Sequence, residues 1–195
     1  LNNGQTCFNG TRILAPKNQY KKISEAVAEL ASTMVIGDAM DPETQMGPMA
    51  SELQRERVEA YIVTGKKEAK LIAGGGRPKN TPQGWFVEPT VFTDVSNDAV
   101  ISREEIFGPV LAIQTFRTVD EVITKANNTP YGLSGGVWTD KGAKIFQVSK
   151  AIRSGVLWAN TFNKFDPTSP FGGYKESGMG REGGLEGLMP YVNLV

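Results

Sequence analysis

Two patterns follow one another at Val110-Leu111-Ala112-Ile113-Gln114-Thr115-Phe116 and Thr118-Val119-Asp120-Glu121. The first is a run of apolar and β-branched residues, which is typical of a buried strand. The second places a glutamate three positions after a threonine, which is the capping-box pattern that begins a helix. We expect this helix to run to about residue 127. A strand that leads directly into a helix is the repeating unit of α/β proteins.

The same alternation continues along the chain in both directions. Asn18, Ser51 and Asp140 are the expected N-caps of three further helices, which end near residues 33, 62 and 152. Further strands are expected at residues 13–15, 69–73, 86–92, 133–138 and 156–159. This order predicts an α/β fold, in which helices cover both faces of a largely parallel, twisted sheet. The chain shows no internal boundary, so we expect one domain over residues 1–195.

The composition excludes several classes of protein. The 195 residues are 39% hydrophobic, which is enough for a substantial core. Lysine plus arginine equals aspartate plus glutamate at 21 each, so neither a nucleic acid nor an anionic membrane is an expected partner. The single cysteine excludes an internal disulfide and favours a reducing compartment, so we expect a cytoplasmic protein. Histidine is absent, which excludes Ser-His-Asp and Cys-His hydrolases and argues against a metal site.

Cys7 stands in a small, polar setting, after Asn3-Gly4-Gln5-Thr6 and before Asn9-Gly10-Thr11. A thiol between glycines can lie on a tight turn, where backbone N–H groups point at the atom that the sulfur attacks. A lone cysteine is more often a buried structural residue, and these residues alone favour that interpretation.

A glycine pattern near the C-terminus has to be set aside. Gly178-Met179-Gly180-Arg181-Glu182-Gly183 has the spacing of a dinucleotide-binding fingerprint. That fingerprint requires a buried strand immediately before it and a helix after it. Tyr174-Lys175-Glu176-Ser177 is not a core strand, so we do not expect a dinucleotide site here.

Four stretches together resemble motifs of the aldehyde dehydrogenase superfamily, in the same order. They are Asn3-Gly4-Gln5-Thr6-Cys7 with Gly10-Thr11-Arg12, Gly84 to Phe92, Glu104-Glu105-Ile106-Phe107-Gly108-Pro109-Val110, and Ser169 to Gly178. The resemblance extends over nearly the whole chain and implies the catalytic-domain portion of that fold. It further implies an oxidoreductase that uses NAD or NADP to convert a small-molecule aldehyde to a carboxylic acid.

The resemblance also implies roles for individual residues. Cys7 would attack the aldehyde as a thiolate, forming a thiohemiacetal and then a thioester, with the oxyanion near its own N–H. Glu105 would accept hydrogen bonds from the nicotinamide ribose, and Phe107 would pack beside the nicotinamide. From the residues alone, Glu105 is a surface carboxylate before buried neighbours. Gln54 matches a glutamine near the cofactor in some relatives, and its capping-box position is a competing explanation.

Phe165 and Phe171 match aromatic residues that line the substrate tunnel of the family. They flank an irregular loop, a setting that favours a functional role over core burial. An aromatic tunnel would favour apolar aldehydes. Trp158, on an expected strand, is better explained as a core residue.

In the family, a nucleotide-binding half, the general-base glutamate and the oxyanion asparagine precede the cysteine motif. None of them lies in these 195 residues, so we expect a portion truncated on its N-terminal side and inactive on its own. The full-length protein would be a homo-oligomer. Two alternatives stay open: a reductase of acyl thioesters or acyl phosphates, which needs no hydrolytic base, and a non-catalytic binding or scaffold relative.

Overall fold

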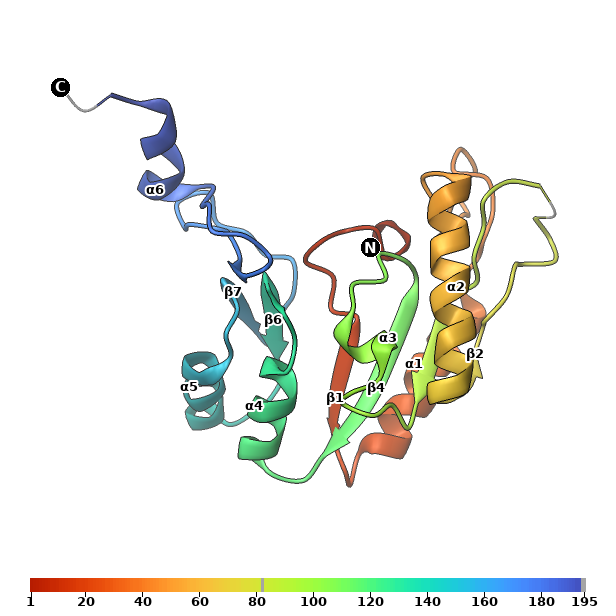
Figure 1. The fold of residues 1–195 in the computed structure, drawn as a ribbon, viewed down its shortest axis with the longest axis horizontal. Helices are drawn as coiled ribbons and strands as arrows, with labels where there is room; N and C mark the ends of the chain where they lie inside the picture. Colours follow the sequence, from red (N-terminus) through yellow and green to blue (C-terminus); the bar gives the residue numbers. More distant parts are fainter. Residues whose placement is uncertain (82, 194–195) are drawn as a thin grey trace. The chain divides into compact units, whose positions relative to one another are not determined.

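In the computed structural model, which describes residues 1–81 and 83–193, the protein divides into two compact units (Figure 1). Unit 1 spans Leu1–Thr118 and unit 2 spans Val119–Val195. Each unit has its own strands and helices. The expectation of a single domain over residues 1–195 stays a prediction.

Unit 1 contains a four-stranded sheet in the order β1-β4-β3-β2. Strands β1 and β3 both run parallel to β4, with Ile13 opposite Ile113 and Thr90 opposite Val110. The edge strand β2 pairs antiparallel with β3. The predicted α/β fold with a largely parallel sheet is therefore confirmed. The strands are β1 Arg12–Pro16, β2 Lys70–Ala73, β3 Thr90–Thr93 and β4 Val110–Phe116.

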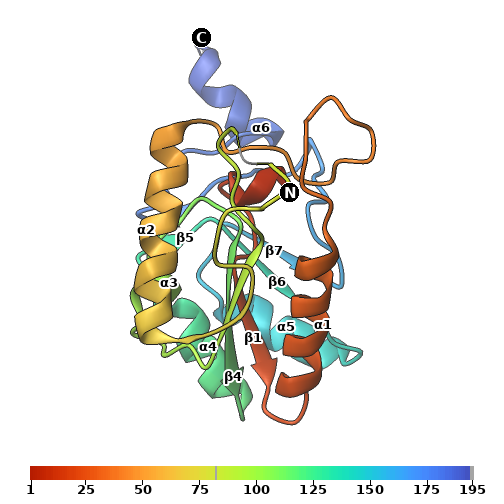
Figure 2. The same cartoon turned by 90° about the vertical axis from the view of Figure 1, so that its right-hand side faces the viewer.

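Two helices cover opposite faces of this sheet, as Figure 2 shows. The helices of unit 1 are α1 Tyr20–Thr33, α2 Glu52–Glu68 and the short α3 Val100–Arg103. Successive side chains of a strand point to opposite faces. Accordingly, Val91 and Ile113 pack in one cluster with α1, whereas Phe92 and Ala112 pack in another with α2.

The contact between α2 and the sheet depends on a glycine inside the helix. A Cβ atom on Gly65 would lie 2.7 Å from the Cζ atom of Phe92, closer than two carbons can approach. Glycine costs helix stability, by roughly 1 kcal/mol relative to alanine. Here it lets the helix lie directly on a fully buried aromatic ring.

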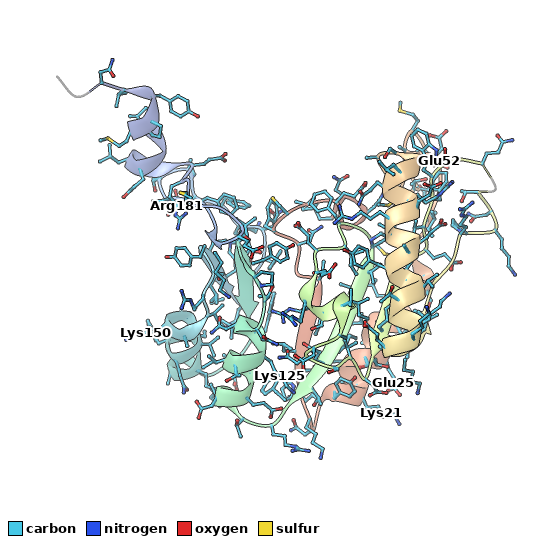
Figure 3. All side chains as sticks on the ribbon, viewed as in Figure 1. Lys21, Glu25, Glu52, Lys125, Lys150 and Arg181 are labelled. Carbon is cyan, nitrogen blue, oxygen red and sulfur yellow. The ribbon has the colours of Figure 1, made fainter. Side chains whose placement is uncertain are left out.

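Of the N-caps expected for α1 and α2, Ser51 is confirmed and Asn18 is wrong. The Ser51 hydroxyl accepts a hydrogen bond from the Gln54 N–H at 3.2 Å, and α2 begins at Glu52, which Figure 3 labels. Asn18 does not cap α1, which begins at Tyr20 after Gln19. The Gln19 N–H instead bonds the Pro16 carbonyl at 2.8 Å, so a turn after β1 takes up Asn18.

The strand expected over residues 86–92 begins four residues late. Phe86 and Val87 are buried, but they lie outside the sheet. Glu88 N–H bonds the Gly76 carbonyl at 3.0 Å, and Pro89 has no N–H to donate. The ladder with β4 therefore starts at Thr90. Apolar periodicity signals burial here, and not strand pairing.

Unit 2 holds two small two-stranded sheets. Strand β6 pairs parallel with β7, and β5 pairs antiparallel with β8. The last pair was not predicted, because each strand has only two residues. The elements are α4 Val119–Asn127, β5 Tyr131–Gly132, β6 Ser134–Val137, α5 Gly142–Ala151, β7 Val156–Ala159, β8 Tyr174–Lys175, α6 Gly184–Leu188 and the 3-10 turn η2 Met189–Tyr191.

The third expected cap, Asp140, is also wrong. The residue before α5 is Lys141, and it makes no side-chain cap. Asn160 fixes the preceding turn by bonding both the N–H and the carbonyl of Thr139, at 2.9 and 3.0 Å. Asp140 lies one position before the N-cap residue. In the part of the chain that the structure describes, no helix is both long and apolar enough to cross a membrane.

Candidate active site

The segment that carries Cys7 is an irregular loop before β1. It opens with a 3-10 turn, η1 Asn2–Gly4, in which Asn2 and Asn3 have positive φ angles of 47° and 54°. Asparagine tolerates this left-handed region better than most residues. The Asn9 N–H bonds the Thr6 carbonyl at 3.0 Å, which places Cys7 at the tip of a turn. Its side chain is exposed, so the buried structural alternative is not supported.

The polar residues around Cys7 fasten this loop to the segment before α2. Asn3 Nδ2 donates hydrogen bonds to the carbonyls of Gly47 and Pro48, at 2.8 and 2.9 Å. Gln5 Oε1 accepts a hydrogen bond from the Ala50 N–H at 2.9 Å. Sequence reasoning missed these two tethers, because each joins residues more than forty positions apart and no local pattern marks them.

A second loop, between α3 and β4, carries Glu105 and Phe107. Glu105 is exposed, Ile106 is buried and Phe107 is half-buried. Phe107 has a φ of 58°, a strained conformation for a bulky residue that persists only where the surroundings hold it.

The two loops meet backbone to backbone. A Cβ atom on Gly4 would lie 1.9 Å from the carbonyl oxygen of Gly108, so only glycine fits at this contact. Gly108 in turn lies against Val58 of α2, where an added Cβ would be 2.4 Å from a methyl group. The glycine of the cysteine motif is thus explained by its contact with the second motif.

Gln54 forms part of the expected cap and also contacts the second loop. Its backbone N–H bonds the Ser51 cap. Its side chain does not reach back to the cap, as a full capping box would require. It donates from Nε2 to the Phe107 carbonyl at 2.8 Å. Gln54 therefore holds the loop beside Cys7, whereas direct contact with a cofactor stays a prediction.

Phe165 and Phe171 lie together in unit 2. Their rings are in edge-to-face contact with centroids 5.0 Å apart. Trp158 packs against Phe165 at 5.4 Å, and its indole N–H bonds the Lys164 carbonyl at 2.7 Å. Trp158 is buried, as expected for a core residue, while Phe165 is 48% exposed.

The structure thus gathers the predicted residues into two groups. In unit 1, Gln54 contacts the loop that carries Glu105 and Phe107, and this loop meets the loop of Cys7 where Gly108 lies against Gly4. In unit 2, Phe165 and Phe171 are in contact. The glycine pattern at residues 178–183 follows a two-residue exposed strand, β8, so it lacks the buried strand of a dinucleotide fingerprint. Among residues 1–81 and 83–193, no cluster of three histidine, cysteine, aspartate or glutamate residues could hold a metal ion.

The fold agrees with that of aldehyde dehydrogenases of known structure. A crystal structure of an aldehyde dehydrogenase from Mycobacterium tuberculosis, complexed with NAD+, matches with a TM-score of 0.94 and 48% identity, covering 98% of this chain and 40% of that one. The profile of the aldehyde dehydrogenase family matches residues 1–195. The chain belongs to the aldehyde dehydrogenase family.

Curated relatives give the same result. The chain is 46% identical over 194 residues to a betaine aldehyde dehydrogenase from Brucella anthropi. It is 46% identical over 191 residues to a geranial dehydrogenase from Castellaniella defragrans. Both matches cover 98% of this chain and 40% of the relative, so the chain spans about 40% of the length of these relatives.

Proposed function

We propose that this chain is the cysteine-bearing part of an NAD(P)-dependent aldehyde dehydrogenase that oxidises aldehydes to carboxylic acids. The observation that carries the proposal is the contact between two loops of unit 1. The exposed Cys7 stands on a loop whose Gly4 lies directly against Gly108, and Gly108 belongs to the loop that carries Glu105 and Phe107. A nucleophile and a cofactor-binding carboxylate on one rigid support are what such a reaction needs.

In the proposed reaction, the Cys7 thiolate attacks the aldehyde carbon and forms a C–S bond. The carbonyl oxygen becomes an oxyanion, which the backbone N–H of Cys7 stabilises. Collapse of this thiohemiacetal releases a hydride and leaves a thioester on Cys7. Water then cleaves the C–S bond, yielding the carboxylic acid and the free thiol. The covalent adduct divides one difficult oxidation into two easier steps.

Glu105 and Phe107 are the proposed cofactor contacts. A carboxylate suits the vicinal diol of a ribose, because its two oxygens accept both hydroxyl hydrogens. Phe107 is half-buried and its backbone has a φ of 58°, and a nicotinamide would pack against its ring. The bound NAD or NADP would supply the hydride acceptor. The similar Mycobacterium tuberculosis structure, a complex with NAD+, supports this cofactor.

The remaining parts of the proposal concern substrate and assembly. Phe165 and Phe171 would line the aldehyde tunnel, and the relatives named for betaine aldehyde and geranial support an aldehyde substrate. Residues 1–195 would form part of a single catalytic domain of a cytoplasmic homo-oligomer. The 195 residues by themselves would not turn over aldehyde, because no further segment would hold the rest of the cofactor.

The test uses the native gene product that contains these residues. It should form NADH or NADPH from an aldehyde, and Cys7→Ala should lower the turnover by at least ~10³-fold, the range seen when a nucleophile is removed. Glu105→Gln is the matched variant on the other loop. It should slow hydride transfer, while mass spectrometry still detects the aldehyde adduct on Cys7. Near-normal turnover by Cys7→Ala would refute the proposal.

A further inference from the structure

One face of α2 makes hydrogen bonds to three residues of the loop that carries Glu105. Gln54, Arg57 and Tyr61 are spaced by three and four positions, so they share a face of the helix. Tyr61 Oη donates to Glu104 Oε2 at 2.7 Å, and Arg57 Nη2 donates to the Glu105 carbonyl at 3.0 Å. With the Gln54 bond to Phe107, this face holds the residue before Glu105, Glu105 itself, and the residue two positions later.

We propose that Tyr61 and Arg57 are positioning residues, which fix the Glu105 carboxylate in the orientation that binds the cofactor. This inference rests on the proposed function of Glu105. The Glu105 side chain is exposed, so core packing does not hold it. Its direction follows from the loop backbone, and displacements of about 1 Å in a site can cost on the order of 10²-fold in rate.

The helix is a firm support for this clamp, because the neighbouring face of α2 is anchored in the core and Tyr61 itself packs against that core. Val58 and Ile62 are 0% and 3% exposed and pack in the cluster that contains Phe92. Val58 also touches Gly108 of the same loop. Polar and apolar residues of α2 therefore both contact this loop.

The surroundings of Tyr61 keep its phenol group protonated, so that it can donate a hydrogen bond. Burial, and next the hydrogen bond to Glu104, raise the pKa of Tyr61 above its ordinary value of 10.0, while Arg57 acts in the opposite direction. At neutral pH the phenol is thus protonated and donates to the Glu104 carboxylate. The Arg57 guanidinium also lies 5.9 Å from the centre of the Tyr61 ring, within the range of a cation–π contact.

A purely structural role for these bonds predicts a different result from a positioning role. If they only stabilise the fold, removing one should lower the thermal midpoint and leave the cofactor affinity of the folded enzyme unchanged. If they position Glu105, the affinity for the cofactor should fall in an enzyme that stays folded. The aldehyde step at Cys7 should be unaffected in that case.

The experiment compares Tyr61→Phe with Tyr191→Phe in the native gene product. Tyr191 is 85% exposed and provides the same chemical change outside α2. Tyr61→Phe should raise the KM for NAD+ or NADP+ by roughly three- to tenfold, as expected for one lost hydrogen bond. The KM for aldehyde should stay within about twofold of the wild-type value. Tyr191→Phe should change neither constant.

A double-mutant cycle tests whether Tyr61 acts through Glu104. Glu104→Ala should raise the KM for the cofactor similarly. The KM of the double variant should be no higher than that of the single variant with the larger effect. An unchanged cofactor KM in Tyr61→Phe, or a lower thermal midpoint with both KM values intact, would overturn the clamp. If the wild-type enzyme binds no NAD(P)+ at all, the proposed function fails as well. If it binds normally and Tyr61→Phe binds equally well, only the clamp fails.

Discussion

Unit 1 and unit 2 use the same kinds of elements but are stabilised in different ways. The buried hydrophobic residues of unit 1 form clusters on both faces of a four-stranded sheet. In unit 2, Trp158 is the one hydrophobic residue that is buried among the described residues. None of the described residues in helices α4, α5 and α6 is buried. Two-stranded sheets are at best marginally stable without further packing.

The two units differ in the contacts that hold their elements together. In unit 1, large side chains fill a core, and the site loops rest on it. In unit 2, close backbone contacts predominate: a Cβ on Gly155 would lie 1.5 Å from the Gly172 carbonyl oxygen. Phe146 on α5 is 70% exposed. It lies one turn before Lys150, which Figure 3 labels. We therefore expect core substitutions to affect the two units very differently.

The largest expected effect comes from truncating one phenylalanine in each unit. Phe92→Ala should lower the free energy of unfolding by about 3–5 kcal/mol, because it empties a fully buried site beneath Gly65. Phe146→Ala should change it by no more than about 0.5 kcal/mol, because the ring is exposed. Chemical denaturation of the two variants checks this pair. Equal losses would show that α5 is as well packed as the sheet of unit 1.

Sequence alone predicts the elements whose signals are local. The apolar run Val110–Phe116 becomes β4 with the expected bounds, and Ser51 caps α2 as its capping box indicates. Asn18 and Asp140 have side chains that suit a cap, but each lies one position before the N-cap residue, which is Gln19 in α1 and Lys141 in α5.

The motifs predict the residues of the candidate site, but they do not predict how its two loops meet. The motifs name Cys7 and Glu105, which fall in the same unit. The contact of Gly4 with Gly108 joins positions about one hundred residues apart. Nor does any motif signal that Tyr61 reaches Glu104. Such contacts depend on how β1 pairs with β4 and on how α2 packs against the sheet, and local patterns do not encode either arrangement.

An intermediate effect should come from the helix caps, which differ between the units. Ser51→Ala should destabilise α2 by about 1 kcal/mol, because the Gln54 N–H loses its acceptor. Lys141→Ser should stabilise α5 by a similar or smaller amount, since Lys141 is an extended N-cap residue without a side-chain cap. Hydrogen exchange of the first turn of each helix would measure both changes. Faster exchange at α5 in Lys141→Ser would contradict the second expectation.

The smallest expected effect concerns two ion pairs and their response to acid. In unit 1, Arg77 Nη2 donates to Glu59 Oε2 at 2.8 Å, and this bond holds the pKa of Glu59 below its ordinary value of 4.5. A lowered carboxyl pKa stabilises the folded state fully above the unfolded value, and the contribution is lost as the pH falls through the folded pKa.

Arg77→Gln should therefore destabilise the protein slightly near neutral pH, and the difference from wild type should vanish in acid. The Asp140–Lys141 pair of unit 2 is the matched control, because both of its side chains are mostly exposed and water screens their attraction. Lys141→Gln should leave stability unchanged at every pH. Denaturation curves at about pH 7 and about pH 3 separate the two cases. An Arg77→Gln defect that persists in acid would mean that Arg77 acts through packing of its side chain and not through the charge of Glu59.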